Sequence, residues 1–264
     1  MDDIILSKQE QNQYSRHIML DSIGLDGQLK IKNAKVLVVG AGGLGSPVLQ
    51  YLAAAGVGTI GVADNDVVAD NNIARQVLFA KDEVGLQKAI IASKKITKYN
   101  PYVKCNIHNI FLTDNRVLKI IDEYDIIVDA TDNLPTRYLL NDACIILDKI
   151  MVHASLFKFQ GLVSVFNFQN GPSYRCLFPF PPRSSKILES GSVGVLGALV
   201  GIIGSIQAGE VLKVITGFGE VLSGNVFVYD MNDNTSYKYG LNRIDENFEI
   251  EDLIDYEEYC KPSI

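Results

Sequence analysis

Short apolar segments recur along the first part of the chain, and longer segments with a mixed pattern separate them. The apolar segments predict buried strands over Val36–Val39, Thr59–Ala63, Val103–Ile107, Ile126–Asp129 and Met151–Ser155. The segments between them predict helices over about residues 46–55, 84–99, 117–123 and 137–147. Strands that alternate with helices of these lengths favour a mostly parallel sheet with helices on both faces.

The pattern differs at the two ends of the chain. Residues 1–33 predict a partly exposed N-terminal helical segment. Residues 161–264 predict a β-rich C-terminal half with antiparallel strands over 162–168, 225–230 and 236–239, a proline-rich crossover loop over 171–191 and a helix over about 193–216. No low-complexity linker or internal repeat interrupts the chain, so we expect a single α/β domain over residues 1–264.

The bulk composition narrows the classes of protein. The chain has 264 residues, 47% of them hydrophobic, and a net charge of −7. Residues 245–258 contain eight acidic residues and no basic one, so the rest of the chain is near neutral, at about +1. This balance argues against a nucleic-acid-binding protein. The acidic segment could attract a basic partner, but such runs are usually solvated, and Ile254 and Tyr256 predict that part of it packs.

Nothing in the pattern predicts insertion into a membrane. The first residues contain no basic segment followed by an apolar stretch, as a secretory signal would. The most apolar run, from about Val193 to Ile206, is shorter than a bilayer span and is followed by Glu210 and Lys213. Four cysteines without tight pairing favour a reducing compartment. We therefore expect a cytoplasmic protein.

A glycine-rich turn follows the first predicted strand and precedes a helix. Gly40, Gly42 and Gly45 have the spacing Gly-x-Gly-x-x-Gly, which lets the backbone approach a phosphate at a helix N-terminus. Asp64 follows the second strand, 24 positions after Gly40, where an acid commonly binds ribose hydroxyls. Residues 34–160 are therefore predicted to be a Rossmann-like nucleotide-binding half. On this signal alone, a nicotinamide- or flavin-dependent enzyme is the first hypothesis.

Residues beyond Asp64 shift the balance towards triphosphate chemistry. Arg75 and Lys88 follow closely, and two cations suit an enzyme that holds three phosphates, although either could be a surface residue. Asp132 lies just beyond the strand that ends at Asp129, at the edge where ligands of such sheets bind. Its carboxylate could hold Mg²⁺. The alternative for Asp132 is an N-cap of the next helix.

Together these residues resemble the MoeB/ThiF/HesA family, the bacterial relatives of ubiquitin-activating enzymes. The resemblance covers nearly the whole chain and rests on Tyr14-Ser-Arg16-His, Gly40-Ala-Gly-Gly-Leu-Gly45, Asp64-Asn-Asp66, Asn72-Ile-Ala-Arg75-Gln76, Lys88, Thr131-Asp132-Asn133 and Tyr174-Arg-Cys176-Leu. It implies an adenylyltransferase that uses ATP and Mg²⁺ to activate the C-terminal carboxylate of a ubiquitin-like sulfur carrier of the molybdopterin or thiamin type. The product would be an acyl-adenylate on a Gly-Gly-type tail, with release of pyrophosphate.

The resemblance also implies roles for individual residues. Asn72, Arg75 and Lys88 would bind the triphosphate and stabilise the transition state, and Asp132 would hold the magnesium ion. Arg16 would reach into the partner subunit's site in a homodimer, a task that suits its permanent charge and forked donors. The full implied ATP-binding set is Gly40, Gly42, Gly43, Asp64, Asp66, Asn72, Arg75, Gln76, Lys88, Asp132 and Asn133.

The chain departs from the family pattern at its zinc site. Typical members carry two Cys-x-x-Cys pairs, whereas here the corresponding segments are Ser173-x-x-Cys176 and Cys260-x-x-Ser263. Such sites need four cysteine or histidine ligands, so we expect no zinc and interpret Cys176 and Cys260 as remnants of a lost site. The loop over 184–191 contains no cysteine, so a covalent thiol relay there is not expected.

Small residues recur along the helix expected near the C-terminus. Gly194, Gly197, Gly201, Gly204 and Ala208 follow one another every three or four positions and so share one helical face. Each glycine costs about 1 kcal/mol relative to alanine within a helix, which implies a close backbone approach on that face. Tight packing within the chain is the first interpretation, and a dimer contact or passage of a substrate tail are the alternatives.

Other functions stay open at this point. The changed cysteines are compatible with adenylation of a short peptide or of a secondary-metabolite carrier. A tRNA-modifying dehydratase of the same superfamily is disfavoured by the near-neutral body. An NAD-dependent oxidoreductase rests only on the glycine turn and Asp64. A binding protein without catalysis is disfavoured by Arg75, Lys88 and Asp132 together.

Overall fold

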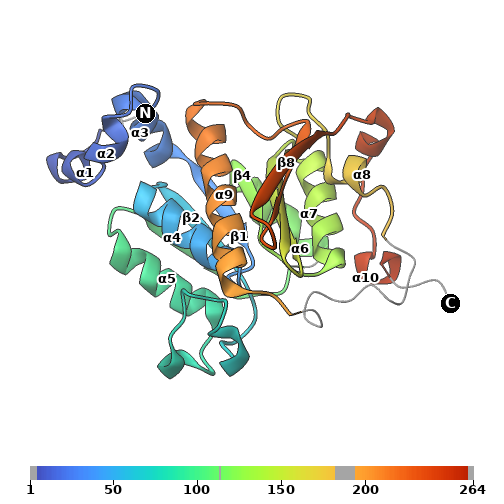
Figure 1. Cartoon of the computed structure of the whole chain (residues 1–264), viewed down its shortest axis with the longest axis horizontal. Coiled ribbons are helices and arrows are strands. Elements are labelled where there is room, and N and C mark those ends of the chain that lie inside the picture. The colour runs from blue at the N-terminus through green and yellow to red at the C-terminus, as the bar shows by residue number, and fades with distance from the viewer. Residues whose placement is uncertain (1–4, 113, 182–193, 261–264) are drawn as a thin grey trace.

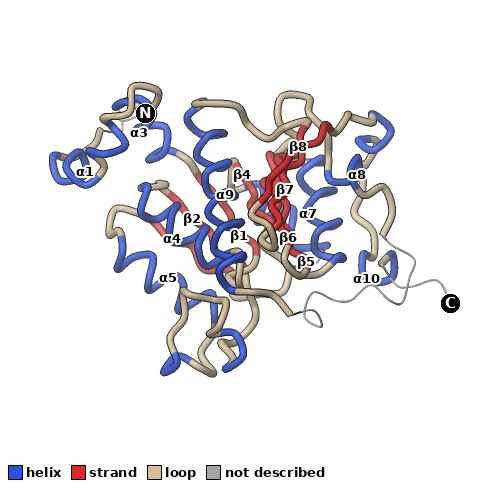
Figure 2. Tube along the Cα trace, viewed as in Figure 1, coloured by secondary structure: helices blue, strands red, loops and turns tan. Residues whose placement is uncertain are grey.

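A mixed β-sheet forms the centre of the protein (Figure 1, Figure 2). The computed structural model describes residues 5–112, 114–181 and 194–260, and within these the sheet has eight strands in the order β3-β2-β1-β4-β5-β6-β7-β8. The predicted fold class, a Rossmann-like α/β sheet with an antiparallel C-terminal part, is confirmed.

The first five strands are parallel to one another. They are β1 (Lys35–Val39), β2 (Thr59–Ala63), β3 (Lys104–His108), β4 (Ile126–Asp129) and β5 (Ile150–Phe157). The chain runs outward from β1 to β3 and then returns to place β4 on the other side of β1. Such a reversal of strand order leaves a crevice at the carboxyl ends of the two central strands, which is where ligands of open α/β sheets bind.

The last three strands extend the sheet in antiparallel fashion. They are β6 (Gln160–Phe166), β7 (Asn225–Asp230) and β8 (Thr235–Gly240). β5 and β6 are joined by a two-residue connection, so the first antiparallel pair is a hairpin. All residues of β8 are exposed, as is usual for an edge strand.

Helices cover both faces of the sheet and form a separate apolar cluster on each. One face carries α4 (Gly45–Ala55), α5 (Lys88–Tyr99) and α9 (Gly197–Thr216), and the other carries α6 (Asp114–Asp122) and α7 (Leu134–Ile146). Strand β1 contributes to both clusters, because successive side chains point to opposite faces. Val36 and Val38 face the first cluster, whereas Leu37 and Val39 face the second.

The long helix α9 ends at Thr216, where the sequence pattern predicted. It has 20 residues and a mean hydropathy of 1.6, enough to span a membrane by length and composition alone. Its inner face packs against α4, β5 and β6, as a core helix does. The charged Glu210 is accommodated on the inner face because its buried carboxylate accepts bonds from Lys213 Nζ (2.6 Å) and Leu222 N (2.8 Å).

The glycines of α9 have two different environments. A Cβ on Gly197 would lie 2.3 Å from Ala74 O, and one on Gly204 would lie 2.4 Å from Pro47 Cγ. These two positions confirm close packing within the chain. Gly194 and Gly201 face open space instead, and Gly194 precedes the helix, which begins at residue 197 rather than 193.

The predicted start of α5 was also wrong. The helix expected over 84–99 begins at Lys88, because Gly85 adopts a φ of +89° that a helix does not allow. The preceding residues pair with Val68 instead, through Gly85 N to Val68 O and Val68 N to Leu86 O, each 2.8 Å. Lys88 therefore stands at the first turn of α5, close to the end of β2.

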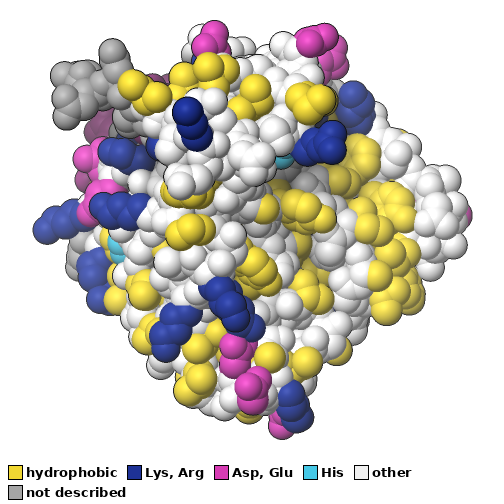
Figure 3. Space-filling view, turned by 90° about the vertical axis from the view of Figure 1, so that its left-hand side faces the viewer, with side chains coloured by type: hydrophobic (Ala, Val, Ile, Leu, Met, Phe, Trp, Pro, Cys, Tyr) yellow, Lys and Arg dark blue, Asp and Glu magenta, His cyan; other side chains and the backbone are white. Residues whose placement is uncertain are grey.

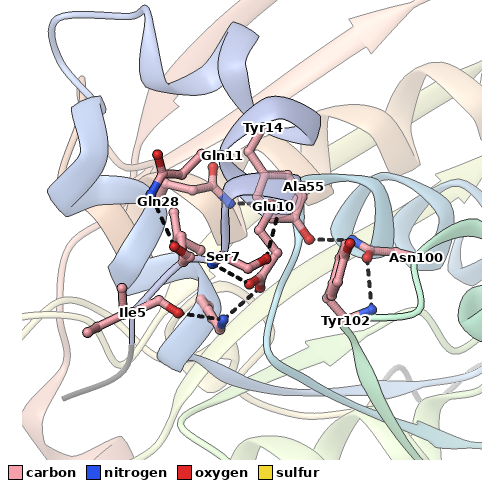
Figure 4. Close-up of polar contacts among 11 residues, drawn as sticks. Ile5, Ser7, Glu10, Gln11, Tyr14, Gln28, Ala55, Asn100 and Tyr102 are labelled. Atoms are coloured by element: carbon pink, nitrogen blue, oxygen red, sulfur yellow. Dashed lines mark hydrogen bonds and ion pairs between the residues drawn. The ribbon is translucent and has the colours of Figure 1, made fainter.

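The N-terminal helical segment consists of α1 (Lys8–Gln13), α2 (Ser15–Ile18) and α3 (Gly24–Asn33). Polar contacts hold this segment together and also join it to the body (Figure 4). The Glu10 carboxylate forms a 2.6 Å ion pair with Lys32 and completes a capping box with Ser7. The Gln28 side chain donates to Ala55 O at the end of α4, over 2.8 Å.

Asn100 makes further buried contacts with the N-terminal segment and the body. Its Nδ2 donates to the Tyr14 hydroxyl and to Ala53 O, each over 2.7 Å, and its Oδ1 accepts from Tyr102 N (Figure 4). Asn100 and Tyr14 are both almost fully buried. The position of α2 relative to the sheet is therefore set by a specific interaction rather than by apolar contact alone.

Two short helices that the sequence pattern did not predict hold the C-terminal segment. α8 (Tyr174–Leu177) and α10 (Tyr256–Tyr259) lie beside α7 (Figure 1). Arg175 forms two 2.7 Å bonds to the Asp142 carboxylate of α7, and the Tyr256 hydroxyl donates to the same carboxylate over 2.7 Å. The prediction that part of the acidic segment packs is confirmed.

Replacing Asn100 tests the attachment of the N-terminal segment. We expect Asn100→Ala to lower the free energy of unfolding by about 1–3 kcal/mol, because Ala53 O and the Tyr14 hydroxyl lose a donor inside the protein. Chemical denaturation measures this change. The exposed turn residue Asn232 is the matched control, since Asn232→Ala should change stability by less than about 0.5 kcal/mol. Equal effects of the two substitutions would refute this account.

Candidate nucleotide-binding site

A pocket of about 510 Å³ opens at the carboxyl ends of β1, β2 and β4. It lies at the crevice where the strand order reverses. Of the predicted ATP-binding residues, it gathers Gly40, Gly42, Gly43, Asp64, Asp66, Arg75, Gln76, Lys88, Asp132 and Asn133. Residues from five separate stretches of the chain thus meet in one place.

The glycine turn is closed so tightly that two of its positions exclude a side chain. A Cβ on Gly45 would lie 1.9 Å from Gly40 O, and one on Gly40 would lie 2.7 Å from Ala130 O. Gly40 also has a φ of +91°, which favours glycine. At Gly42 the nearest atom would be Gln76 Nε2 at 3.5 Å, an ordinary contact.

Asp64 joins the end of β2 to the glycine turn. Its Oδ2 accepts from Ala41 N and its Oδ1 from Asp66 N, each over 2.8 Å. Burial raises the pKa of the Asp64 carboxyl, against the lowering effect of Lys88 and of the two N–H groups. The carboxylate is therefore held in one orientation beside the turn, where a ribose would lie if phosphates occupied the turn.

The two predicted cations lie on the same wall. Lys88 is only 5% exposed, and its Nζ forms a 2.9 Å ion pair with the exposed Asp66. Arg75 is half-buried, and its Nη1 donates to Asn71 O over 2.8 Å. A buried ammonium with one solvated partner keeps donors available for an anion in the pocket.

The predicted residues Asn72 and Asn133 have structural contacts. Asn72 is buried in a 3₁₀ turn, where its Oδ1 accepts from Ala69 N and its Nδ2 donates to Asn71. Asn72 is absent from the described pocket wall, whereas its neighbour Asn71 is on it. Asn133 caps α7 by accepting from Thr136 N over 2.9 Å, so the cap considered for Asp132 is provided by Asn133.

Arg137 is a pocket residue that the sequence analysis did not assign. It lies one turn into α7, and its Nη2 donates to Thr131 O over 2.9 Å. Its Nε and the Oε1 of Gln76 are buried polar atoms without a partner among the described residues. Buried polar atoms left unpaired are costly, and both line the pocket, so the wall suits a polar ligand such as a nucleotide. In the sequence, the sign of this role was that Arg137 follows Asp132 by five positions, in the first turn of the next helix.

The remaining predicted residues lie outside the pocket. Arg16 is exposed on α2 and does not line it. Cys176 is buried, and its Sγ accepts from Ser173 N (3.4 Å) and Ile244 N (3.3 Å). Burial would raise the pKa of this thiol, but these bonds and those from the Ser173 and Asn247 side chains hold it below its usual value.

Cys260 packs, half-buried, on the apolar cluster that contains α7. Within the described residues, no three His, Cys, Asp or Glu side chains gather as they would around a metal ion. Ser263 and the loop over 184–191 lie outside the described residues.

The fold and the pocket define a nucleotide-binding α/β protein. The ThiF family model matches residues 14–247. The chain therefore belongs to the ThiF family, and the resemblance inferred from the motifs is confirmed.

Relatives in this family are closely similar over most of the chain. "Sulfur carrier protein adenylyltransferase" of Thermus thermophilus is 42% identical over 266 residues, which covers 96% of this chain and 98% of the relative. "Adenylyltransferase and sulfurtransferase MOCS3" of Culex quinquefasciatus is 44% identical over 262 residues. That match covers 97% of this chain but 60% of the relative, so the chain spans well under the full length of the MOCS3 relatives.

Solved structures share the architecture. Escherichia coli MccB superposes with a TM-score of 0.79 at 22% sequence identity, over 92% of this chain and 73% of MccB. MccB bound to ATP has a TM-score of 0.78 at 23% identity, with 90% of this chain and 73% of MccB covered. At these identities the similarity shows the fold.

The glycine turn supplies a paired test of the pocket. Gly45→Ala should destabilise the protein by about 1–3 kcal/mol or more, because its Cβ meets backbone that cannot move aside. Gly42→Ala should keep stability within about 1 kcal/mol while weakening nucleotide binding, because its Cβ occupies pocket space. Thermal denaturation and nucleotide titration calorimetry measure the two effects. A Gly45→Ala protein as stable as the wild type would contradict the described turn.

Proposed function

We propose that the protein is an ATP-dependent adenylyltransferase that activates the C-terminal carboxylate of a small ubiquitin-like sulfur carrier as an acyl-adenylate. The observation that carries the proposal is the meeting of the glycine turn, Asp64, Lys88 and Arg75 in one pocket. A ribose-type acid and two cations beside a phosphate-binding turn match a nucleoside triphosphate better than a dinucleotide.

The proposed step needs no nucleophile from this chain. A carboxylate oxygen of the carrier tail attacks the α-phosphorus of ATP, the bond to the β-phosphate oxygen breaks, and pyrophosphate leaves. Lys88 and Arg75 stabilise the negative charge that develops on the phosphoryl oxygens. Asp132, on the pocket wall, is the carboxylate proposed to hold Mg²⁺, which typically binds one or two carboxylates together with substrate phosphates.

Relatives support a protein carrier as the substrate. The Thermus thermophilus protein, similar over its whole length, is named for adenylation of a sulfur carrier protein. We infer the same substrate class here, with a Gly-Gly-type tail, and a cytoplasmic location that agrees with four free cysteines. Adenylation of a short peptide is the second candidate, because structures of MccB with MccA share this fold.

ATP–pyrophosphate exchange with purified carriers tests the activity. We expect exchange that requires the terminal Gly-Gly of the carrier. Lys88→Met and Arg75→Ala should each lower the exchange rate by a factor on the order of 10²–10³, since each removes one charge from the transition state. Lys81→Met is the matched control, because Lys81 is an exposed lysine between Arg75 and Lys88 in the chain and pairs with Asp70. It should change the rate by less than about twofold.

Two results would contradict this proposal. Reduction of a nicotinamide cofactor without any exchange would identify an oxidoreductase. Exchange with short peptides and none with a Gly-Gly carrier would instead favour the second candidate.

We further propose a homodimer in which Arg16 completes the partner subunit's site. The contacts of Tyr14 with Asn100 and of Gln28 with Ala55 attach the N-terminal segment to the body (Figure 4), and Arg16 does not line the pocket of its own chain. Large apolar residues near Arg16 are exposed, with Met19 at 69% and Leu20 at 50%. Figure 3, which shows this side of the molecule, has apolar side chains among basic ones. Such apolar exposure is typical of an interaction surface.

Helix α9 offers a second apolar area next to that segment. It contacts α3, and only 44% of its apolar stretch is buried within the chain. Its outward residues are small or apolar: Gly201, Ile202, Ser205, Ile206 and Gly209 are all partly exposed. A second copy of the chain would bury this area, as expected for an obligate dimer.

Mixing two inactive variants tests the exchange of Arg16 between subunits. Arg16→Ala and Lys88→Met alone should each lose activity by a factor on the order of 10². When the two are refolded or co-expressed together, about a quarter of wild-type activity should return, because each mixed dimer has one intact composite site. Arg116→Ala, an exposed arginine on α6, is the control for loss of surface charge. No recovery on mixing would show that Arg16 does not act across subunits.

A further inference from the structure

A buried polar chain lies directly beneath the loop that carries Asp132. His153 on β5 and Asp129 on β4 are both 0% exposed, and His153 Nδ1 lies 2.6 Å from Asp129 Oδ2. The other oxygen, Asp129 Oδ1, accepts from Thr131 N over 3.0 Å and from the Thr131 hydroxyl over 2.6 Å. Both carboxylate oxygens of Asp129 are thus occupied, one by His153 and one by the loop.

The protonation of the pair follows from its surroundings. Burial lowers the pKa of His153 and outweighs the raising effect of Asp129. Burial would raise the pKa of Asp129, but the bond from His153 and the charge of Arg137 hold it below its usual value. Neutral His153 therefore donates its Nδ1–H to the Asp129 carboxylate, which fixes the tautomer of the ring.

The rest of the neighbourhood is fixed as well. The Gln207 side chain of α9 donates to Asp129 O (2.8 Å) and to Val152 O (3.0 Å), which ties the ends of β4 and β5 together. Arg137 of α7, on the other face of the sheet from α9, holds the loop after β4 through a 2.9 Å bond from its Nη2 to Thr131 O. The backbone of β4, β5 and the loop is thus held by Gln207 and Arg137. The orientation of the Asp129 side chain is set by its bond with His153.

The position of His153 is energetically unfavourable for a polar ring. Its ring lies against Tyr174 and Phe166, with centroids 5.0 and 5.9 Å away. Its Nε2 is buried and has no partner among the described residues. An apolar residue in this place would have no unpaired ring nitrogen, but it would also take the donor away from Asp129 Oδ2. A gain elsewhere is needed to explain a histidine at this position. Among the residues that the structure describes, Asp129 is the hydrogen-bond partner of the ring.

We propose that His153 is a positioning residue which, through Asp129 and Thr131, holds the loop that presents Asp132 to the magnesium–nucleotide complex. This inference rests on the proposed function for the identity of the ligand. It assigns His153 no contact with the ligand and no proton transfer to it. Residues that orient a metal-binding carboxylate from behind typically change metal affinity or rate by 10-fold to 100-fold.

Two variants separate positioning from core packing. His153→Asn keeps a donor near the place of Nδ1, whereas His153→Leu fills the space without a donor. Phe166→Leu is the matched control, because Phe166 packs against the same ring and is 1% exposed but makes no bond to Asp129. All three variants should be compared as folded proteins by thermal denaturation before any functional measurement.

The first measurement is proton NMR of the protein without nucleotide. The chain has three histidines, and a short bond to a carboxylate should give His153 a strongly downfield Nδ1 proton. This signal should vanish in His153→Leu and persist in Phe166→Leu. Its absence from the wild type would overturn the inference, because the bond to Asp129 would not exist.

The second measurement is nucleotide affinity with Mg²⁺ and with a chelator. In His153→Leu the gain in affinity from Mg²⁺ should fall about tenfold, while His153→Asn and Phe166→Leu should keep most of it. In exchange assays, kcat of His153→Leu should be about tenfold lower than that of the wild type, with little change in KM for ATP. An unchanged Mg²⁺ gain in His153→Leu, or an equal loss in Phe166→Leu, would reduce His153 to a packing residue. Absence of exchange in the wild type would refute the proposed function, but the proton signal and the Mg²⁺ gain would still decide the role of His153.

Discussion

The nucleotide pocket depends on a backbone contact that leaves no room for a side chain. At the end of β1 the chain turns so sharply that a Cβ on Gly45 would lie 1.9 Å from Gly40 O. This turn brings the start of α4 to the edge where Asp64 follows β2 and Asp132 follows β4. Asp64 then bonds Ala41 N within the turn, so the acid and the turn hold each other. The rest of the pocket is built around this junction.

Specific polar contacts fix the outer segments on an apolar frame. Apolar contacts within the two clusters on the faces of the sheet have no preferred direction. Such contacts alone would allow several placements of the N-terminal and C-terminal segments. Asn100 selects one placement for α2 by bonding Tyr14 and Ala53, and Asp142 selects one for α10 by bonding Arg175 and Tyr256. In the first placement Arg16 is exposed and does not line the pocket, and the second packs part of the acidic segment beside α7.

The central strands, the glycine turn and the positions of Asp64, Arg75, Lys88 and Asp132 could be predicted from the sequence. Short-range patterns encode them, because apolar runs and glycine spacing act within a few residues. The start of α5 could not be predicted, since Gly85 and its pairing with Val68 depend on a contact 17 positions away. Nor could the exchange of roles between Asp132 and Asn133 at the cap of α7, which depends on the path of the loop.

The sequence by itself determined the elements, their order and the chemical types at the carboxyl edge of the sheet. The tertiary structure decided which of those side chains share a cavity. Arg16 and Asn72 do not line that cavity, whereas Arg137 and Gln76 line it with polar atoms that have no partner in the described part of the chain. The tertiary structure also placed His153 of β5 against Asp129 of β4, two strands that only sheet pairing makes neighbours. The reason is physical: local patterns specify strands and helices, whereas partners for buried polar groups are set by the packing of distant segments.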